Sequence, residues 1–127
     1  MNTKSEEMKR RTKRFGLLIL NLLDHLPNTI GGRAVANQIV RSATSVGANY
    51  RAACRARSRA EFASKIGTVA EEADESLYWL EVLDEGKLVS NQKIGGLLKE
   101  ADELTAIFTA ARRSASEPQP SKIKPQK

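Results

Sequence analysis

Four segments of the chain repeat the spacing of an amphipathic helix, and this repetition is the feature that most constrains the fold. The first segment places apolar residues at i, i+3, i+4, i+7, i+8 and i+11: Phe15, Leu18, Ile19, Leu22, Leu23 and Leu26. A helical period returns from Val35 to Val46, from Phe62 to Leu80 and from Ile94 to Phe108. An apolar stripe on each of four helices predicts an all-α protein with one shared core.

Turn-forming residues separate the four segments. Pro27 should end a first helix over residues 4–26, because the residue before a proline is pushed out of the α region. Ser58-Arg59-Ala60-Glu61 matches a capping box at the start of the third helix. Gly86 is expected to end that helix in a left-handed conformation, and Ser90 to cap the fourth. Helices with such short connections pack antiparallel, so the sequence predicts an up-and-down four-helix bundle.

A change of composition divides the chain into a bundle domain, residues 1–114, and a tail, residues 115–127. The tail is rich in Ser, Pro, Lys and Gln, and it contains Pro118, Pro120 and Pro125. We predict that it is disordered, since it has almost no large apolar residue to bury. The length of 127 residues fits one domain.

Charge alternates along the chain more strongly than the net charge of +6 suggests. Residues 1–59 carry 12 Lys and Arg against 3 Asp and Glu, residues 60–104 carry 4 against 11, and residues 105–127 carry 5 against 1. In an antiparallel pair, the basic start of the first helix lies near the basic end of the second. This end predicts candidate phosphate contacts to RNA or DNA: Arg10, Arg11, Arg14, Arg51, Arg55 and Arg57. The alternative is a solvated end neutralised by acids of the third helix or of a neighbouring subunit.

Apolar residues also occur away from the core stripes of the first and third helices. They are Leu17, Leu20, Tyr78, Trp79, Val82 and Leu83. Aromatic anchors such as these are enriched in protein–protein interfaces, which favours self-association through these faces. The alternative is a wide core stripe together with scattered surface leucines.

Residues for catalysis, metal binding or membrane insertion are scarce. His25 is the only histidine and Cys54 the only cysteine, so neither a di-iron bundle site nor a multi-thiolate zinc site can be assembled. Gly31-Gly32 and Gly95-Gly96 lack the spacing of a phosphate-binding loop. The apolar run Phe15–Leu20 is far shorter than the roughly 20 residues of a membrane span. We therefore predict a cytoplasmic protein that is not an enzyme, uses no cofactor or metal, and has no membrane partner.

The run Gln38–Asn49, followed by Arg57-Ser58 and Glu61-Phe62, resembles the family of 23S rRNA-intervening-sequence proteins. Leu26-Pro27 is similar to the end of helix one in that family. The resemblance implies a bacterial antiparallel four-helix bundle that assembles as a ring, commonly a homopentamer, without an established enzymatic activity. The chain is also similar to the basic bundle subunit that accompanies reverse transcriptases in diversity-generating retroelements.

Two functions follow as expectations. The first is an oligomeric scaffold or adaptor that contacts itself and another protein, and the alternative is an accessory protein that binds RNA or DNA through its arginine-rich end.

The residues that carry the resemblance are Arg41, Ser42, Ser45, Asn49, Ser58, Glu61, Phe62 and Glu75. We predict a structural role for them, with Ser45 and Asn49 hydrogen-bonding across a tight helix contact and Arg41 pairing with Glu72 or Glu75. Ligand binding is the alternative. The chain departs from the family at Ala52-Ala53, where Glu-Gly is common, and this departure makes the end of the second helix more basic.

Overall fold

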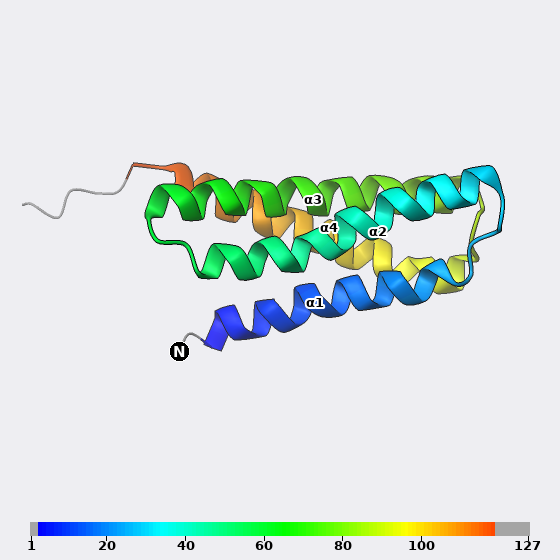
Figure 1. The fold of residues 1–127 in the computed structure, drawn as a ribbon, viewed down its shortest axis with the longest axis horizontal. Helices are drawn as coiled ribbons and strands as arrows, with labels where there is room; N and C mark the ends of the chain where they lie inside the picture. The colour runs from blue at the N-terminus through cyan, green and yellow to red at the C-terminus, as the bar shows by residue number, and fades with distance from the viewer. Residues whose placement is uncertain (1–2, 119–127) are drawn as a thin grey trace, which may run out of the picture.

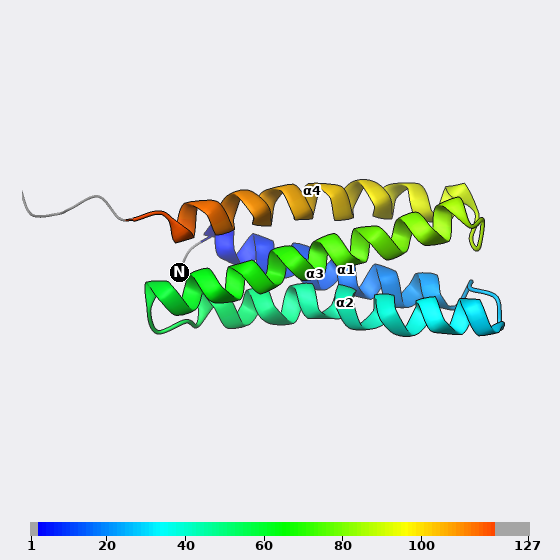
Figure 2. The ribbon, with the colours of Figure 1, turned by 90° about the horizontal axis from the view of Figure 1, so that it is seen from above.

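The computed structural model describes residues 3–118, which form four long helices (Figure 1). These are α1 (Thr3–Leu23), α2 (Ile30–Cys54), α3 (Arg59–Glu85) and α4 (Asn91–Ser116). Consecutive helices run in opposite directions, so the predicted antiparallel four-helix bundle is confirmed (Figure 2). None of the helices within residues 3–118 is long and apolar enough to cross a membrane.

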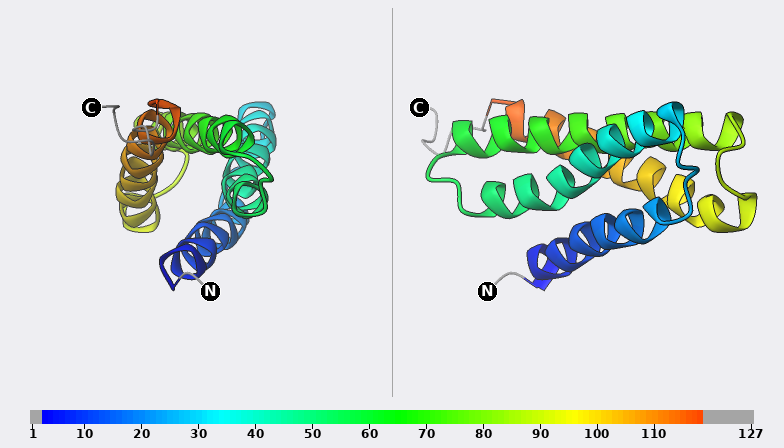
Figure 3. Two further views of the ribbon diagram at one scale, coloured as in Figure 1. Left: turned by 90° about the vertical axis from the view of Figure 1, so that its left-hand side faces the viewer. Right: turned by 45° about the vertical axis from the view of Figure 1, so that its right-hand side comes forward.

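The helices follow one another around the bundle, but the circle is not closed evenly. Seen end-on, α2 and α3 form one corner, while α1 leans away from α4 toward its N-terminus (Figure 3). The inner helices α2 and α3 each pack against two neighbours, whereas α1 packs mainly on α2 and touches α4 much less. The side between α1 and α4 is therefore the open side of the bundle.

The core is made of one inward stripe from each helix. Its largest fully buried side chains are Phe15, Ile19, Ile39, Ile66, Leu80, Leu83, Ile94, Leu104 and Phe108. Tyr50 adds a ring contact, with its centroid 5.4 Å from that of Phe108. Leu18 differs from its prediction: 36% of it is exposed, because it lies at the edge of the stripe on the open side.

The contact between α1 and α2 depends on small residues. A Cβ at Gly47 would lie 3.3 Å from the backbone carbonyl of Thr12, and a Cβ at Gly16 would lie 3.5 Å from the carbonyl oxygen of Ala43. A side chain at Gly47 would require the backbone of α1 to move, whereas a Cβ at Gly16 would make an ordinary van der Waals contact. Gly47 therefore sets how closely α1 approaches α2.

Several helix ends differ from their predicted positions or conformations. Helix α1 ends at Leu23, and the next residues form turns in which the amide of Leu26 donates to Leu23 O. Gly86 follows α3 with φ −79°, and the left-handed residue is Lys87 with φ 57°. A glycine is still required at residue 86, because a Cβ there would lie 2.9 Å from Val82 O. Ser90 occupies the N-cap position of α4 without a side-chain capping bond.

The boundary between bundle and tail lies slightly later than predicted. Helix α4 continues to Ser116, past the predicted end of the bundle at residue 114. Residues 119–127, which make up most of the predicted tail, lie outside the described residues.

Candidate interaction surfaces

The topology brings both basic groups of the sequence to one end of the bundle. The start of α1, the end of α2, the start of α3 and the end of α4 all lie at that end (Figure 1). Lys9, Arg10 and Lys13 of α1 line the same groove as Arg51 of α2. The predicted juxtaposition of the two groups is therefore confirmed, and we call this region the basic end.

Five of the six predicted nucleic-acid contacts are free cations. Arg10, Arg51, Arg55 and Arg57 lie at the basic end, and Arg14 lies midway along α1; all five are exposed and form no ion pair within residues 3–118. The side chain of Arg59 is used differently, since its Nη2 donates to the carbonyl of Glu117 at 2.8 Å beyond the end of α4. The free guanidinium groups of Arg10, Arg51, Arg55 and Arg57 make this end strongly positive.

Arg11 is not a free cation, which corrects its assignment as a candidate phosphate contact. Its Nε and Nη2 donate to the two oxygens of Glu100 at 2.7 and 2.8 Å, and Nη2 also donates to Glu103 at 2.8 Å. These bonds raise the pKa of Arg11 above its usual range, with the Glu100 hydrogen bond as the main cause. The forked guanidinium suits this bidentate geometry. Arg11 therefore ties α1 to α4 across the open side.

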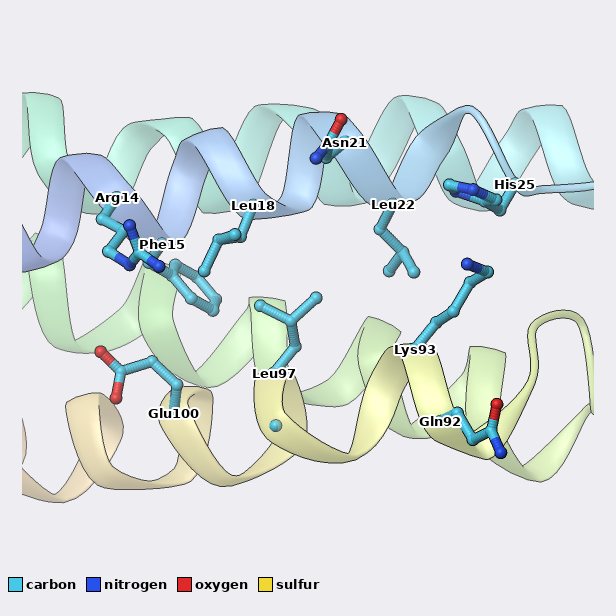
Figure 4. Close-up of a pocket in the computed structure, with 11 residues that line it drawn as sticks. Arg14, Phe15, Leu18, Asn21, Leu22, His25, Gln92, Lys93, Leu97 and Glu100 are labelled. Carbon is cyan, nitrogen blue, oxygen red and sulfur yellow. The ribbon is translucent and has the colours of Figure 1, made fainter.

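A groove of about 550 Å³ runs along the open side, between α1 and α4. Figure 4 shows Phe15, Leu18 and Leu22 of α1 facing Leu97 of α4 across it. Arg14, Lys93 and His25 add polar groups to its lining. Sequence periodicity did not reveal this groove, because its width depends on the tilt of α1 and not on which residues are apolar.

A second groove, of about 490 Å³, lies between α1 and α2. Small residues line it at the helix contact, among them Gly16, Thr44, Gly47 and Ala48. Cations line it toward the basic end, and Leu17 and Leu20 line it farther along α1. We call this the α1/α2 groove.

The predicted outer apolar residues separate into three classes. Leu17, Leu20 and Tyr78 are 58%, 43% and 55% exposed, which confirms their outward placement. Trp79 and Val82 are half-buried and pack against the core. Leu83 is fully buried, so its assignment to a subunit interface is wrong. It follows Leu80 by three residues and therefore continues the core stripe of α3.

The outer face of α3 is acidic around Tyr78. Glu71, Asp74, Tyr78, Glu81 and Glu85 are exposed and recur at the spacing of one helix face. Within the described residues only Glu71 of this set forms an ion pair, to Arg112 at 3.8 Å. We call these five residues the acidic face of α3.

The serines and asparagine of the family motif act inside the bundle, but not as predicted. Asn49 donates to the carbonyl of Ser45 at 2.9 Å, which is a bond within α2 and not across a helix contact. The bond between helices is made by Ser42, whose buried Oγ lies 2.9 Å from Oγ of the buried Ser76. The sequence does not predict the role of Ser76, because a serine within an apolar stripe does not indicate which residue it will hydrogen-bond.

The ion pair predicted for Arg41 is confirmed with both candidate acids. Nη1 lies 3.1 Å from Glu72 Oε2, and Nη2 lies 2.6 Å from Glu75 Oε2. Trp79 Nε1 also donates to Glu75, at 3.2 Å. The Arg41 hydrogen bond is the main cause that holds the pKa of Glu75 below its usual value. This cluster fixes the outer surfaces of α2 and α3 relative to each other.

The remaining motif residues start α3. Ser58 Oγ accepts from the amide of Glu61 at 3.0 Å, as the predicted capping box requires. The Glu61 carboxylate reaches one residue further back than expected and accepts from the amide of Arg57 at 2.6 Å. Phe62 is half-buried against the core. At the departure from the family, Ala53 is buried and Ala52 is half-buried.

Few residues of the bundle have the chemistry of a reactive centre. Within residues 3–118 no group of three His, Cys, Asp or Glu side chains could hold a metal ion. His25 is exposed after the end of α1, and Cys54 is half-buried at the end of α2. Burial, with a contribution from Cys54, raises the pKa of Tyr50 to about 12. Tyr50 therefore acts as a neutral packing residue against Phe108.

Residues 4–110 match the family model of the 23S rRNA-intervening sequence protein. The chain belongs to this family. A solved protein of unknown function from the S23 ribosomal protein family of Bacteroides thetaiotaomicron is similar to it, with a TM-score of 0.78 and 31% identity. The similarity covers 87% of this chain and 99% of that one. Among proteins with curated functions, none matches the sequence.

Membership of the 23S rRNA-intervening sequence protein family confirms the resemblance carried by residues 38–49. Membership establishes the family of the bundle, whereas the function of the bundle depends on its surfaces. In this member of the family those surfaces are the basic end, the two grooves and the acidic face of α3.

Proposed function

We propose that this protein is a non-enzymatic bundle that assembles with copies of itself and serves as a scaffold or adaptor. The observation that supports this most is the exposure of Leu17, Leu20 and Tyr78 on two outer helix faces. Large apolar side chains grouped on an outer face favour association, because contact removes their surface from water. Tyrosine in particular is enriched among residues that dominate binding energy.

The placement of the residues that could act as acids or bases supports a non-enzymatic role. His25, the one histidine, is exposed in the turn after α1, and the free carboxylates are spread along the acidic face of α3. General acid–base catalysis requires groups that converge on one reacting atom. The grooves are instead lined mainly by apolar and cationic side chains, and the one carboxylate of each groove, Glu100 or Glu6, is paired with a cation.

Size-exclusion chromatography with light scattering tests the self-assembly. The full chain should elute with a mass that is a multiple of 14.0 kDa. A Leu17→Ser/Leu20→Ser variant should shift toward the monomer, whereas Ile30→Ser, which changes an exposed apolar residue at the start of α2 outside the α1/α2 groove, should not. A wild-type chain that stays monomeric at micromolar concentration would refute the proposed function.

A second function, binding of RNA or DNA, is supported by the four free arginines at the basic end, Arg10, Arg51, Arg55 and Arg57. Phosphate contacts release counterions, so such binding weakens steeply with salt and reads little sequence. Gel shifts with structured RNA over a salt series test it. Each lost phosphate contact lowers the slope of log affinity against log salt by roughly 0.7 to 0.9, so Arg51→Gln/Arg55→Gln/Arg57→Gln should lower it by about 2 to 3.

Arg33→Gln provides the matched control for this experiment. Arg33 is an exposed arginine at the other end of α2, where its Nη1 donates to Asn28 at 2.9 Å. The control should leave the salt slope unchanged. Absence of binding at low salt, or an equal loss in the control, would remove nucleic acid as a partner of the basic end.

A further inference from the structure

We propose that the α1/α2 groove of one copy receives the acidic face of α3 from a second copy of this chain. The inference rests on the self-assembly proposed above and names the two surfaces that meet. Four properties of the described residues support it: charge, shape, apolar content and the separation of the two surfaces on the bundle.

The first property is opposite charge. Lys9, Arg10, Lys13 and Arg51 line the groove, and Glu6 is the only carboxylate among the lining residues. Glu6 Oε2 lies 3.0 Å from Lys9 Nζ, so Glu6 neutralises Lys9 and none of the other three cations. Arg10, Lys13 and Arg51 have no ion pair within residues 3–118.

The partner surface has the complementary charge and few internal partners. Asp74, Glu81 and Glu85 are exposed and form no ion pair within the described part of the chain. Glu71 has only the long contact to Arg112, at 3.8 Å. Docking this face into the groove would pair the free carboxylates with the free cations.

The second and third properties concern shape and apolar content. The small residues at the α1–α2 contact leave a concave surface that can accept side chains from a convex helix face. Leu17 and Leu20 are the exposed apolar residues on the groove, and Tyr78 is the exposed apolar residue on the acidic face. Contact between these surfaces would bury all three side chains, whereas a nucleic-acid phosphate backbone would leave the leucines in water. A second copy therefore fits the groove better than nucleic acid.

The fourth property is that the two surfaces lie on different sides of the bundle. After one contact, the first copy still has a free acidic face and the second copy still has a free groove. Helix α3 is separated from α1 by α2 in the end-on view (Figure 3). An interface between unlike surfaces propagates until it closes as a ring or continues as a filament. The proposed contact therefore predicts an assembly larger than a dimer.

Charge exchange in the full chain tests the pairing. Variant one, Asp74→Lys/Glu81→Lys, makes the α3 face positive, and variant two, Lys13→Glu/Arg51→Glu, makes the groove negative. Each variant repels its own copies, so its mass should fall to the 14.0 kDa of the monomer. The combination of all four substitutions in one chain should restore the wild-type mass. Lys99→Glu and Asp102→Lys, at exposed positions of α4, are the matched controls and should leave the mass unchanged.

The outcomes distinguish a failure of the surface pairing from a failure of the self-assembly on which the pairing rests. A monomeric wild-type chain would refute the self-assembly itself. If the wild type assembles and either variant keeps the wild-type mass, the pairing of these surfaces is refuted while self-assembly stands. This includes the outcome in which variant two keeps its mass and loses only RNA binding. Two folded monomeric variants whose combination stays monomeric would also overturn the pairing. Circular dichroism of each variant confirms that the helices are intact.

Discussion

Arg41 lies at the surface with half of its side chain exposed, yet it binds two carboxylates of the neighbouring helix. It holds Glu72 and Glu75, and Glu75 in turn accepts from Trp79. The cluster is therefore a chain of contacts that runs from α2 to the half-buried indole of α3. Solvent screens such a pair, so its energetic contribution is about 0.5 kcal/mol.

A pH dependence follows from the lowered pKa of Glu75. A carboxyl group whose pKa is lower in the folded than in the unfolded state stabilises the fold above its ordinary value of 4.5, and this stabilisation is lost as the pH falls. Urea unfolding between pH 7 and pH 3 should therefore show a smaller loss of stability for Glu75→Gln than for the wild type. Glu71→Gln is the control, because within residues 3–118 its only ion pair is the long one to Arg112. Equal losses in the wild type and Glu75→Gln would contradict the role given to this pair.

Individual residues also show what the sequence could predict. The pairing of Arg41 with an acid of α3 was predictable, because both lie on neighbouring helices at a known register. The bond of Arg11 to Glu100 was not, since 89 positions separate the residues and the bond depends on the tilt of α1. Leu83 was assigned to the surface because the sequence does not show how wide a stripe an inner helix must bury. The free arginines could be located at one end, but their lack of partners required coordinates.

At the scale of elements, the α1–α2 contact depends on a glycine, Gly47, that faces the backbone of the neighbouring helix. Gly47 lets the two backbones approach, and it lines the α1/α2 groove together with Gly16. The packing of α1 and the shape of the proposed binding surface therefore have one cause. The core stripes alone predicted that α1 packs on the bundle, but not how closely.

Gly47→Val should separate these helices. Its Cβ would lie 3.3 Å from the Thr12 carbonyl, so we expect a destabilisation of about 1 to 3 kcal/mol, typical of overpacking. The matched control is Gly95→Val on α4, where a Cβ meets nothing within 4 Å. Thermal unfolding should show a lower midpoint for Gly47→Val and an unchanged or slightly higher one for Gly95→Val. Equal midpoints in the two variants would show that the close approach of α1 and α2 does not contribute to stability.

For the whole molecule, the separation of charge between the basic groove and the acidic face suggests that assembly responds to salt. Exposed charges are screened beyond about 10 Å at 0.1 M salt and beyond about 3 Å at 1 M. If opposite charges hold the copies together, light scattering at 1 M salt should give a lower mass than at 0.05 M. An interface held only by leucines and Tyr78 would instead keep or gain mass, because salt does not screen apolar contacts. The measurement therefore weighs the two contributions to assembly.

The up-and-down topology has a practical consequence for anyone who labels this protein. The first turn of α1 and the last turn of α4 both lie at the basic end, so an affinity tag or dye attached to either turn would stand beside the surface whose binding is being measured (Figure 1). Cys54, the natural attachment point for a thiol-reactive probe, closes α2 at the same end. The turn between α3 and α4, around Lys87, lies at the opposite end and is exposed. An immobilisation handle placed there would leave the arginines accessible to solution.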